Sequence, residues 1–365
     1  MSNKRVAIIG LGLIGGSLAR ALKERIGIND IIAVNRSSES LNAALGDRII
    51  ARGFNELNQY VYDSDIIFIC TPVKYTIEYL KAIKDKIRPG CIVTDVGSTK
   101  HEIISYVNQI EDPPVFIGGH PMAGTEKTGY KAGFVHLFEN AYYVLTPSKT
   151  TTQSSLKIMI DIINGIGGIP VVLNAEEHDN ITGCISHVPH IIASALVNMV
   201  KNMDTADGKM QMLAAGGFKD ITRIASSSSE MWENIVLSNK EQIRGILDIY
   251  VELLSKFKKY LENGSSEEIY TFFESARNYR NKFSAVKKGL INPIYDIIVD
   301  VVDKPGILGE ITTILGSNDI NIKNIEVSSN RELEQGCLRI SLPDSDSENK
   351  AYSLLTSKGY EVYKR

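Results

Sequence analysis

Cysteine is scarce in this sequence, with four residues in a chain of 365. The four lie far apart and form no CxxC pair; they are Cys70, Cys91, Cys184 and Cys337. This spacing does not suit a disulfide framework or a cysteine-based zinc site. It favours a reducing compartment, and we therefore expect a cytoplasmic protein.

An excess of positive charge and a long apolar run are also lacking. Lys and Arg number 40 and Asp and Glu number 43, which gives a formal net charge of −3. Because phosphate binding needs a local excess of Lys and Arg, nucleic acid is not an expected partner. No run reaches the ~18 apolar residues of a membrane span. Glycines interrupt the apolar stretch Val6–Ala19, which could otherwise imitate a signal peptide.

The first part of the chain, residues 1–148, alternates short β-branched apolar runs with helical stretches. Val6–Ile9 and Ile66–Cys70 are two of these runs. Continuous apolar strands separated by helices predict a parallel sheet that is covered on both faces. We therefore expect an α/β Rossmann-type, dinucleotide-binding domain here.

The composition changes after this first part. Residues 149–288 carry long patterns with apolar residues three and four apart, including predicted helices over Glu176–Asn202 and Ile221–Ser238. They predict an all-α domain whose long apolar faces favour a homodimer. After a linker at Lys288–Pro293, residues 294–365 have the βαββαβ order of a ferredoxin-like domain.

A glycine-rich loop follows the first predicted strand and opens a helix. In a GxGxxG loop the first glycine allows a tight turn, the second admits the pyrophosphate, and the third lets helix and strand pack closely. The helix N-terminus then presents N–H groups to the phosphates. The alternative is a glycine-rich turn without a ligand. The residues expected to bind the dinucleotide are Gly10, Gly12, Leu13, Ile14 and Gly15.

The end of the second strand bears on the choice between NAD and NADP. An acidic residue there would bind the ribose hydroxyls, but this sequence has Asn35, Arg36 and Ser37. Arg36 could pair with a 2′-phosphate, so the segment favours NADP. The alternative is that Arg36 is a solvated surface residue.

A histidine lies in a second loop, Gly118–Glu126, with glycines on both sides. The unperturbed pKa of histidine, ~6.5, makes neutral imidazole available near pH 7, which suits His120 to acid–base catalysis. A structural histidine is the alternative. His187 and His190 are three residues apart, but Pro189 breaks the pattern and hydride transfer needs no metal, so no metal is expected.

Several segments of the sequence match one enzyme family together. They are Gly10–Ser17, Cys70–Pro72, Asp95–Lys100, Gly119–Glu126, Glu177–Asp179, Ser186–His190 and Gly217–Ala225. On these segments the chain resembles the prephenate dehydrogenase family along nearly its whole length. The resemblance implies oxidative decarboxylation of prephenate to 4-hydroxyphenylpyruvate in L-tyrosine biosynthesis, with hydride transfer to NAD or NADP.

The resemblance also implies roles for individual residues. His120 is similar to the family's catalytic base, which takes the proton from the ring hydroxyl of the substrate. Ser98 is similar to the hydroxyl that hydrogen-bonds His120 or the substrate hydroxyl and orients both. Arg223 resembles the arginine that holds a substrate carboxylate. Further residues assigned to the substrate are Thr125, Glu126, Ser186, His190 and Asp220. Those assigned to the cofactor are Cys70, Thr71 and Pro72.

The tail carries the segment Asp303–Glu310 between its first predicted strand and helix. This segment resembles the ACT domain, a small module that binds amino acids and pairs with a copy of itself. The resemblance implies feedback regulation, with L-tyrosine as the expected effector; a purely structural dimer module is the alternative. The expected effector-binding residues are Pro305, Gly306, Ile307, Leu308 and Asn321.

Three other functions remain open from the sequence. Arogenate, which has an amine in place of the ketone, could be the substrate. A 2-hydroxyacid dehydrogenase with an ACT tail would lack its acid/base pair and leave Ser186–His190 unexplained. A non-catalytic sensor of dinucleotide and amino acid predicts that His120→Asn changes nothing, whereas an enzyme would lose at least ~100-fold in rate.

Overall fold

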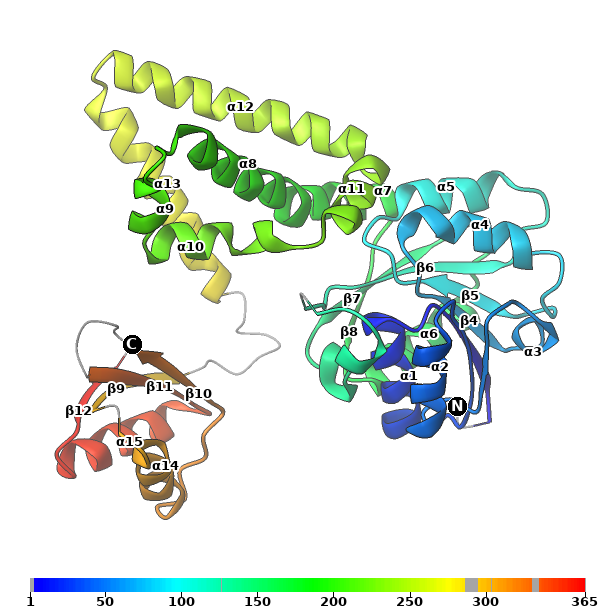
Figure 1. Cartoon of the computed structure of the whole chain (residues 1–365), viewed down its shortest axis with the longest axis horizontal. Coiled ribbons are helices and arrows are strands. Elements are labelled where there is room, and N and C mark those ends of the chain that lie inside the picture. Colours follow the sequence, from blue (N-terminus) through cyan, green and yellow to red (C-terminus); the bar gives the residue numbers. More distant parts are fainter. Residues whose placement is uncertain (1–2, 126, 286–294, 303, 330–334, 365) are drawn as a thin grey trace. The chain divides into compact units, whose positions relative to one another are not determined.

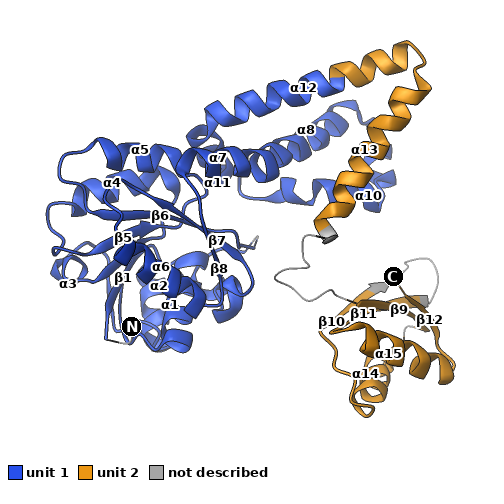
Figure 2. Cartoon of the chain, turned by 180° about the vertical axis from the view of Figure 1, so that it is seen from behind, with its two compact units in different colours: residues 1–254 blue, residues 255–365 orange. Residues whose placement is uncertain are grey.

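The computed structural model describes residues 3–125, 127–285, 295–302, 304–329 and 335–364. Predicted site residue Glu126 and the predicted linker Lys288–Pro293 lie outside the described residues. The chain divides into two compact units, residues 1–254 and 255–365 (Figure 2). The boundary falls inside helix α12 (Lys240–Glu262).

The N-terminal part of the first unit is built on one eight-stranded sheet in the order β3-β2-β1-β4-β5-β6-β7-β8. All neighbouring strands are parallel except β6 and β7. The strands are β1 (Arg5–Ile9), β2 (Asp30–Val34), β3 (Arg52–Phe54), β4 (Ile66–Ile69), β5 (Ile92–Asp95), β6 (Val115–Pro121), β7 (Tyr142–Pro147) and β8 (Ile169–Val172). The predicted Rossmann-type architecture is confirmed.

Helices cover both faces of this sheet because its strands are apolar on both sides (Figure 1). Val6 and Ile8 pack with residues of α1 and α6 on one face, and Ala7 and Ile9 pack with residues of α4 and α5 on the other. The helices of this part are α1 (Leu13–Ile26), α2 (Ser38–Gly46), α3 (Gln59–Tyr62), α4 (Val73–Ile83), α5 (His101–Gln109) and α6 (Gln153–Gly165). Two short 3₁₀ turns, η1 (Tyr130–Ala132) and η2 (Val135–Phe138), precede β7.

The sheet extends beyond residue 148, where the sequence pattern places the end of the first domain. β7 pairs antiparallel with β6, and β8 pairs with β7, so sheet residues continue to Val172. The helix α6 between them packs on the sheet through Met159 and Ile162. Residues up to Val172 are therefore part of the same layered structure, and the sheet is mixed rather than purely parallel.

Helices follow the sheet, as the sequence predicts. They are α7 (Ala175–Thr182), the π-helical turn η3 (Gly183–His187), α8 (Val188–Met203), α9 (Lys209–Leu213), α10 (Gly216–Thr222), the 3₁₀ turn η4 (Arg223–Ser226), α11 (Ser229–Ser238), α12 and α13 (Ser266–Ala285). The single helix predicted over Ile221–Ser238 is wrong, because the chain leaves helical geometry after η4 and Ser228 caps a new helix with its side chain.

One continuous helical stretch, Ala175–Met203, is long and apolar enough by length and composition to cross a membrane. It spans α7, η3 and α8. His178, Asp179 and His187 within it are buried and hydrogen-bond to residues outside it. Such a polar cluster is costly in lipid, so we assign the stretch to the packed helical region.

The C-terminal part of the second unit has the predicted βαββαβ order. Its elements are β9 (Tyr295–Val302), α14 (Ile307–Gly316), β10 (Asn324–Ser329), β11 (Gln335–Leu342), α15 (Ser345–Ser357) and β12 (Glu361–Lys364). The antiparallel sheet has the order β10-β11-β9-β12, and its core includes Ile297, Leu338 and Ile311. This is the ferredoxin-like topology of the split βαβ.

Candidate active site

The predicted dinucleotide residues meet at the carboxyl ends of the neighbouring strands β1, β2 and β4. Gly10 has a φ of +98°, and a Cβ there would lie 2.5 Å from the Cys70 carbonyl oxygen. A Cβ on Gly15 would lie 2.0 Å from the Gly10 carbonyl oxygen. Only glycine fits at these two positions, so the close packing of loop, helix and strand requires the motif.

The open face of this loop suits a dinucleotide. Gly12 is the N-cap of α1 and has no heavy atom within 4 Å of a would-be Cβ, which leaves room for a pyrophosphate at the N-terminus of the helix. The buried Thr71 hydroxyl has no protein hydrogen-bond partner. Leu13 and Ile14 begin α1, and Pro72 is the N-cap of α4, next to these groups in the sequence. The residues present therefore fit an NAD(P) site.

Asn35 binds the glycine loop rather than standing free at the end of β2. Its Oδ1 accepts from the Leu11 N–H at 3.0 Å, and its Nδ2 donates to the Ser37 carbonyl at 3.3 Å. Arg36 is exposed, and its guanidinium carbon lies 5.9 Å from the centre of the Tyr75 ring. A cation over an aromatic face is a favourable contact, and the pairing of Arg36 with a 2′-phosphate stays a prediction.

His120 is a buried residue near the end of β6, at the same edge of the sheet. Its Nδ1 lies 2.8 Å from Nε2 of His178 on α7, and Nδ1 of His178 lies 2.7 Å from Oδ1 of Asp179. Burial lowers the pKa of His120 well below its usual value, and the nearby His178, Lys100 and His187 lower it further. His120 is therefore neutral at pH 7, which is the protonation state that a general base requires.

Asp95, at the end of β5, connects the loop that carries Ser98 with strand β6, which carries His120. Its carboxylate accepts from the N–H groups of Gly97 at 2.8 Å and Gly119 at 3.2 Å. Lys100 forms a salt bridge with the same carboxylate, and both side chains are 0% exposed. Ser98, which lies between Asp95 and Lys100 in the sequence, is half-buried.

Asp179 joins the helical region to the sheet. Its carboxylate accepts from the backbone N–H groups of Lys100 at 2.7 Å and His101 at 2.9 Å, at the start of α5. Asn239 donates to the Asp179 carbonyl at 2.8 Å and lies 3.0 Å from Nδ1 of His187. The N-terminus of a helix stabilises a carboxylate, so this contact fixes α7 against the nucleotide-binding part.

Ser186 lies within a turn that Pro189 helps to create, and His190 follows this turn in α8. Proline has no N–H to donate to the carbonyl four residues earlier, and the helix widens into the π turn η3 at this point. Such turns are common at functional sites. The ring of His190 stacks on that of Trp232, with centroids 3.6 Å apart. Trp232 also has a buried indole N–H without a protein partner.

The remaining predicted substrate residues lie on the surface. Thr125 is exposed in the loop after β6, and its Oγ1 accepts from the Lys127 N–H. Asp220 and Arg223 are exposed at the junction of α10 and η4. Their roles in substrate binding stay predictions.

Sequence reasoning did not assign a role to His178, Asp179, Lys100, Asp95 or Asn239. A signal was present for the first four, since they lie within the segments Glu177–Asp179 and Asp95–Lys100. Among the described residues, no group of three or more His, Cys, Asp or Glu side chains is arranged to hold a metal ion.

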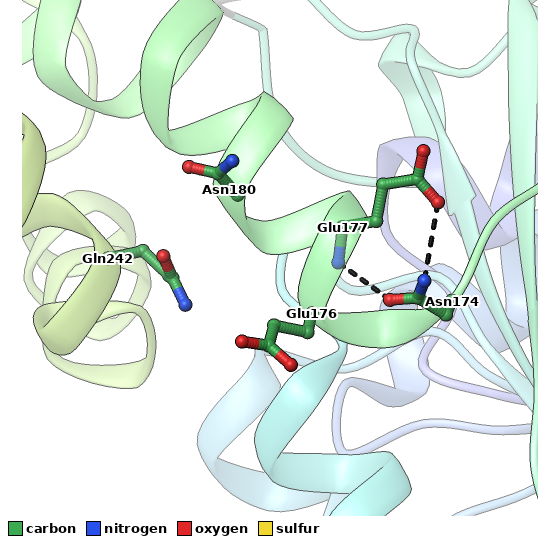
Figure 3. A pocket seen from close by; sticks show the side chains of 5 residues that line it. All are labelled: Asn174, Glu176, Glu177, Asn180 and Gln242. Carbon is green, nitrogen blue, oxygen red and sulfur yellow. Dashed lines mark hydrogen bonds between the residues drawn. The ribbon is translucent and has the colours of Figure 1, made fainter.

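A polar pocket of about 380 Å³ is lined by residues of α7, by Asn174 before it and by Gln242 of α12 (Figure 3). Asn174 caps α7 there by accepting from the Glu177 N–H at 2.8 Å. Two carboxylates in the lining disfavour an anionic substrate, so this pocket is not a candidate for the reaction. It is lined by Asn174, Glu176, Glu177, Asn180 and Gln242.

The C-terminal domain has a more apolar pocket of about 350 Å³. Gly306 caps α14 with a φ of +94°. Asn321, which the sequence analysis included in the effector site, is exposed outside this lining. The pocket is lined by Val301, Lys304, Pro305, Gly306, Ile307, Leu308, Val327, Gly336 and Leu338.

Comparison with known proteins agrees with this division of the chain. The family described as "Prephenate dehydrogenase, nucleotide-binding domain" matches residues 18–172, "Prephenate dehydrogenase, dimerization domain" matches 174–275, and "ACT domain" matches 295–350. A prephenate dehydrogenase of Bacillus subtilis is 37% identical over 361 residues, which cover 98% of this chain and 97% of that protein.

Solved structures are similar as well. The prephenate dehydrogenase of A. aeolicus, solved with hydroxyphenyl propionate and NAD+, is 31% identical with a TM-score of 0.73. The match covers 78% of this chain and 99% of that one. An arogenate dehydrogenase of Synechocystis is 29% identical with a TM-score of 0.69, covering 76% and 99% of the two chains.

Proposed function

The chain belongs to the prephenate dehydrogenase family, and on that premise we propose that it converts prephenate to 4-hydroxyphenylpyruvate and CO2 with hydride transfer to NAD(P)+. The observation that carries the proposal is His120. It is a buried, neutral imidazole at the sheet edge that also holds the glycine loop. Ligands bind at this edge in open α/β sheets.

The reaction requires one base and binding groups for two carboxylates from the protein. His120 takes the proton from the ring hydroxyl while hydride leaves the same carbon; the bound NAD(P)+ supplies the hydride acceptor. CO2 is then lost and the ring becomes aromatic. The phenolate oxygen formed in this way takes a proton back from His120, so the neutral base is regenerated.

The substrate anchors include the cationic and polar groups of the helical region. Arg223 suits a carboxylate because its planar guanidinium can donate two parallel hydrogen bonds. His190 and Ser186 supply further donors, and Thr125, Glu126 and Asp220 complete the proposed set. Ser98 orients the substrate hydroxyl toward His120.

The substrate test compares prephenate with arogenate. Prephenate has a ketone where arogenate has an amine. Arogenate is tested because the chain is also similar to an arogenate dehydrogenase. We expect kcat/KM to be higher for prephenate. A higher kcat/KM for arogenate would change the substrate and keep the mechanism.

Arg36, Ser37 and Asn35 favour NADP+ over NAD+. Asn35 brings no negative charge to oppose a 2′-phosphate, and its side chain already hydrogen-bonds to the Leu11 N–H and the Ser37 carbonyl. Arg36→Ala should therefore raise KM for NADP+ and leave KM for NAD+ almost unchanged. Equal changes in both KM values would contradict this assignment.

The C-terminal domain acts as a feedback sensor for L-tyrosine. An amino-acid carboxylate suits the N-terminus of α14 at Gly306, and apolar side chains such as Leu308 and Leu338 suit an aromatic ring. Truncation after Lys288 should leave prephenate turnover in place and abolish its sensitivity to L-tyrosine. A truncated enzyme that stays equally sensitive would contradict the regulatory role.

The helical region forms a homodimer, and the enzyme works in the cytoplasm. Large apolar side chains on α9 to α12 are exposed in the single chain, with Leu213 at 72% and Ile249 at 62%. Exposed apolar surface of this kind marks an association site. All four cysteines are unpaired thiols, which supports a reducing compartment.

A further inference from the structure

A chain of hydrogen bonds starts at Nδ1 of His120. It runs from Nδ1 of His120 to Nε2 of His178 over 2.8 Å, and from Nδ1 of His178 to Oδ1 of Asp179 over 2.7 Å. His178 and Asp179 are fully buried on α7. The two imidazole rings meet edge to face, with centroids 5.0 Å apart.

The donors and acceptors in this chain can be arranged in one way when Asp179 is ionised and both rings are neutral. A carboxylate only accepts, so Nδ1 of His178 must carry its proton. Nε2 of His178 is then an acceptor, and Nδ1 of His120 must donate to it. A neutral imidazole has one proton, so the lone pair of His120 is left on Nε2.

We infer that His178 and Asp179 are positioning residues that fix the tautomer and ring orientation of His120, so that Nε2 faces the substrate as a ready acceptor. This inference rests on the proposed function, in which His120 is the base. In the Ser-His-Asp triad a carboxylate orients the catalytic histidine directly. Here a second imidazole, that of His178, lies between the carboxylate and the base.

The carboxylate is itself held by groups from another element. Asp179 also accepts from the backbone N–H groups of Lys100 and His101 at the start of α5. These donors belong to the nucleotide-binding part, and Asp179 belongs to the helical region. The geometry of the base in β6 therefore depends on α7 being packed against α5.

The decisive comparison is between two substitutions of His178. His178→Gln can still accept from His120 through Oε1 and donate to Asp179 through Nε2, whereas His178→Leu can do neither. We expect His178→Leu to lower kcat at least ~100-fold, within the usual range for acid–base catalysis. His178→Gln should retain kcat within about tenfold of the wild type. KM for NAD+ should stay unchanged in both variants.

Asp179→Asn tests the far end of the chain. Oδ1 of Asp179 accepts from both the Lys100 N–H and Nδ1 of His178, and Oδ2 accepts from the His101 N–H. In either orientation the amide NH2 group would oppose one of these backbone N–H groups, and at the Oδ1 position it would also face Nδ1 of His178. The latter orientation reverses both hydrogen bonds and moves the proton of His120 to Nε2. In the Ser-His-Asp triad the same substitution costs ~10⁴-fold in kcat, and here we expect a loss of at least ~100-fold.

Repeating the measurement in a His120→Asn enzyme distinguishes a positioning role of His178 from a role in packing. In a His120→Asn enzyme the His178→Leu change should cost less than about threefold, because residues that act through one another are not additive. Thr76→Val on α4 also replaces a buried polar group by an apolar one, outside this hydrogen-bond chain, and kcat should stay within about fivefold of the wild type. Losses by His178→Leu that are equal in both backgrounds, or that Gln does not rescue, would overturn the inference.

A second measurement needs no variant. The protein has six histidines, so a ¹H–¹⁵N spectrum of ¹⁵N-histidine enzyme can report which nitrogen of His120 carries the proton. Protonation at Nδ1 is expected, and protonation at Nε2 would overturn the inference. Failure of the wild-type enzyme to oxidise prephenate would instead contradict the proposed function, so the two failures are distinguishable.

Discussion

The buried salt bridge between Lys100 and Asp95 gives the sharpest prediction for stability. Both side chains are 0% exposed, and Asp95 also accepts from the N–H groups of Gly97 and Gly119. Lys100→Met would leave a buried carboxylate without its counter-charge. Removing one partner of such a pair costs ~3–5 kcal/mol, which is a large share of the ~5–15 kcal/mol that keeps a typical protein folded.

The assay is urea denaturation of the full chain. Lys131→Met is the matched control, because Lys131 pairs with Glu39 at 2.8 Å but the two side chains are 77% and 79% exposed. We expect a clear fall in the urea midpoint for Lys100→Met and no measurable change for the control.

A double variant tests the cause of the loss. Adding Asp95→Asn to Lys100→Met removes the buried charge and keeps an acceptor oxygen for a loop N–H group. It should recover about half of the lost free energy of unfolding. An unchanged midpoint for Lys100→Met, or a further fall in the double variant, would refute the reasoning.

The remaining predictions concern the glycine loop, pH and assembly. Gly15→Ala should abolish NAD(P)+ binding in a fluorescence titration, because its Cβ would lie 2.0 Å from the Gly10 carbonyl oxygen, whereas Gly46→Ala has no atom within 4 Å and should bind normally. Burial lowers the pKa of His187 to about 4 from 6.5. Between pH 6.5 and 4 the unfolded chain therefore binds a proton that the folded chain does not. As the pH falls through this range, the contribution of His187 should lower the free energy of unfolding by about 3 kcal/mol. His187→Gln should remove this contribution to the pH dependence. Ile249→Asp should shift the proposed dimer to monomer in sedimentation, while Lys258→Asp on an exposed, charged stretch should not.

Much of the fold can be predicted because the strongest signals are local. The strands β1 and β4 are continuous apolar runs buried on both faces, and the glycine loop follows directly on β1. The βαββαβ tail is similarly regular. The strand β8 is only partly buried and carries Pro170, so its sequence gives little indication that it extends the sheet.

The active site is less accessible to sequence reasoning because its contacts join distant residues. His120 can be predicted from its loop, but its partner His178 is 58 residues away. Asp179 meets the start of α5 from 79 residues away. The spacing of apolar residues predicts the helix that carries both, while their orientation toward His120 depends on how α7 packs.

Reduced-nucleotide absorbance with purified enzyme, prephenate and NAD+ or NADP+ tests the central claim most directly. The wild type should produce NADH or NADPH with prephenate, and His120→Asn should reduce kcat at least ~100-fold without changing KM for the nucleotide. Turnover that survives His120→Asn would contradict the assignment of the base. The absence of turnover with prephenate and either nucleotide would contradict the proposed reaction.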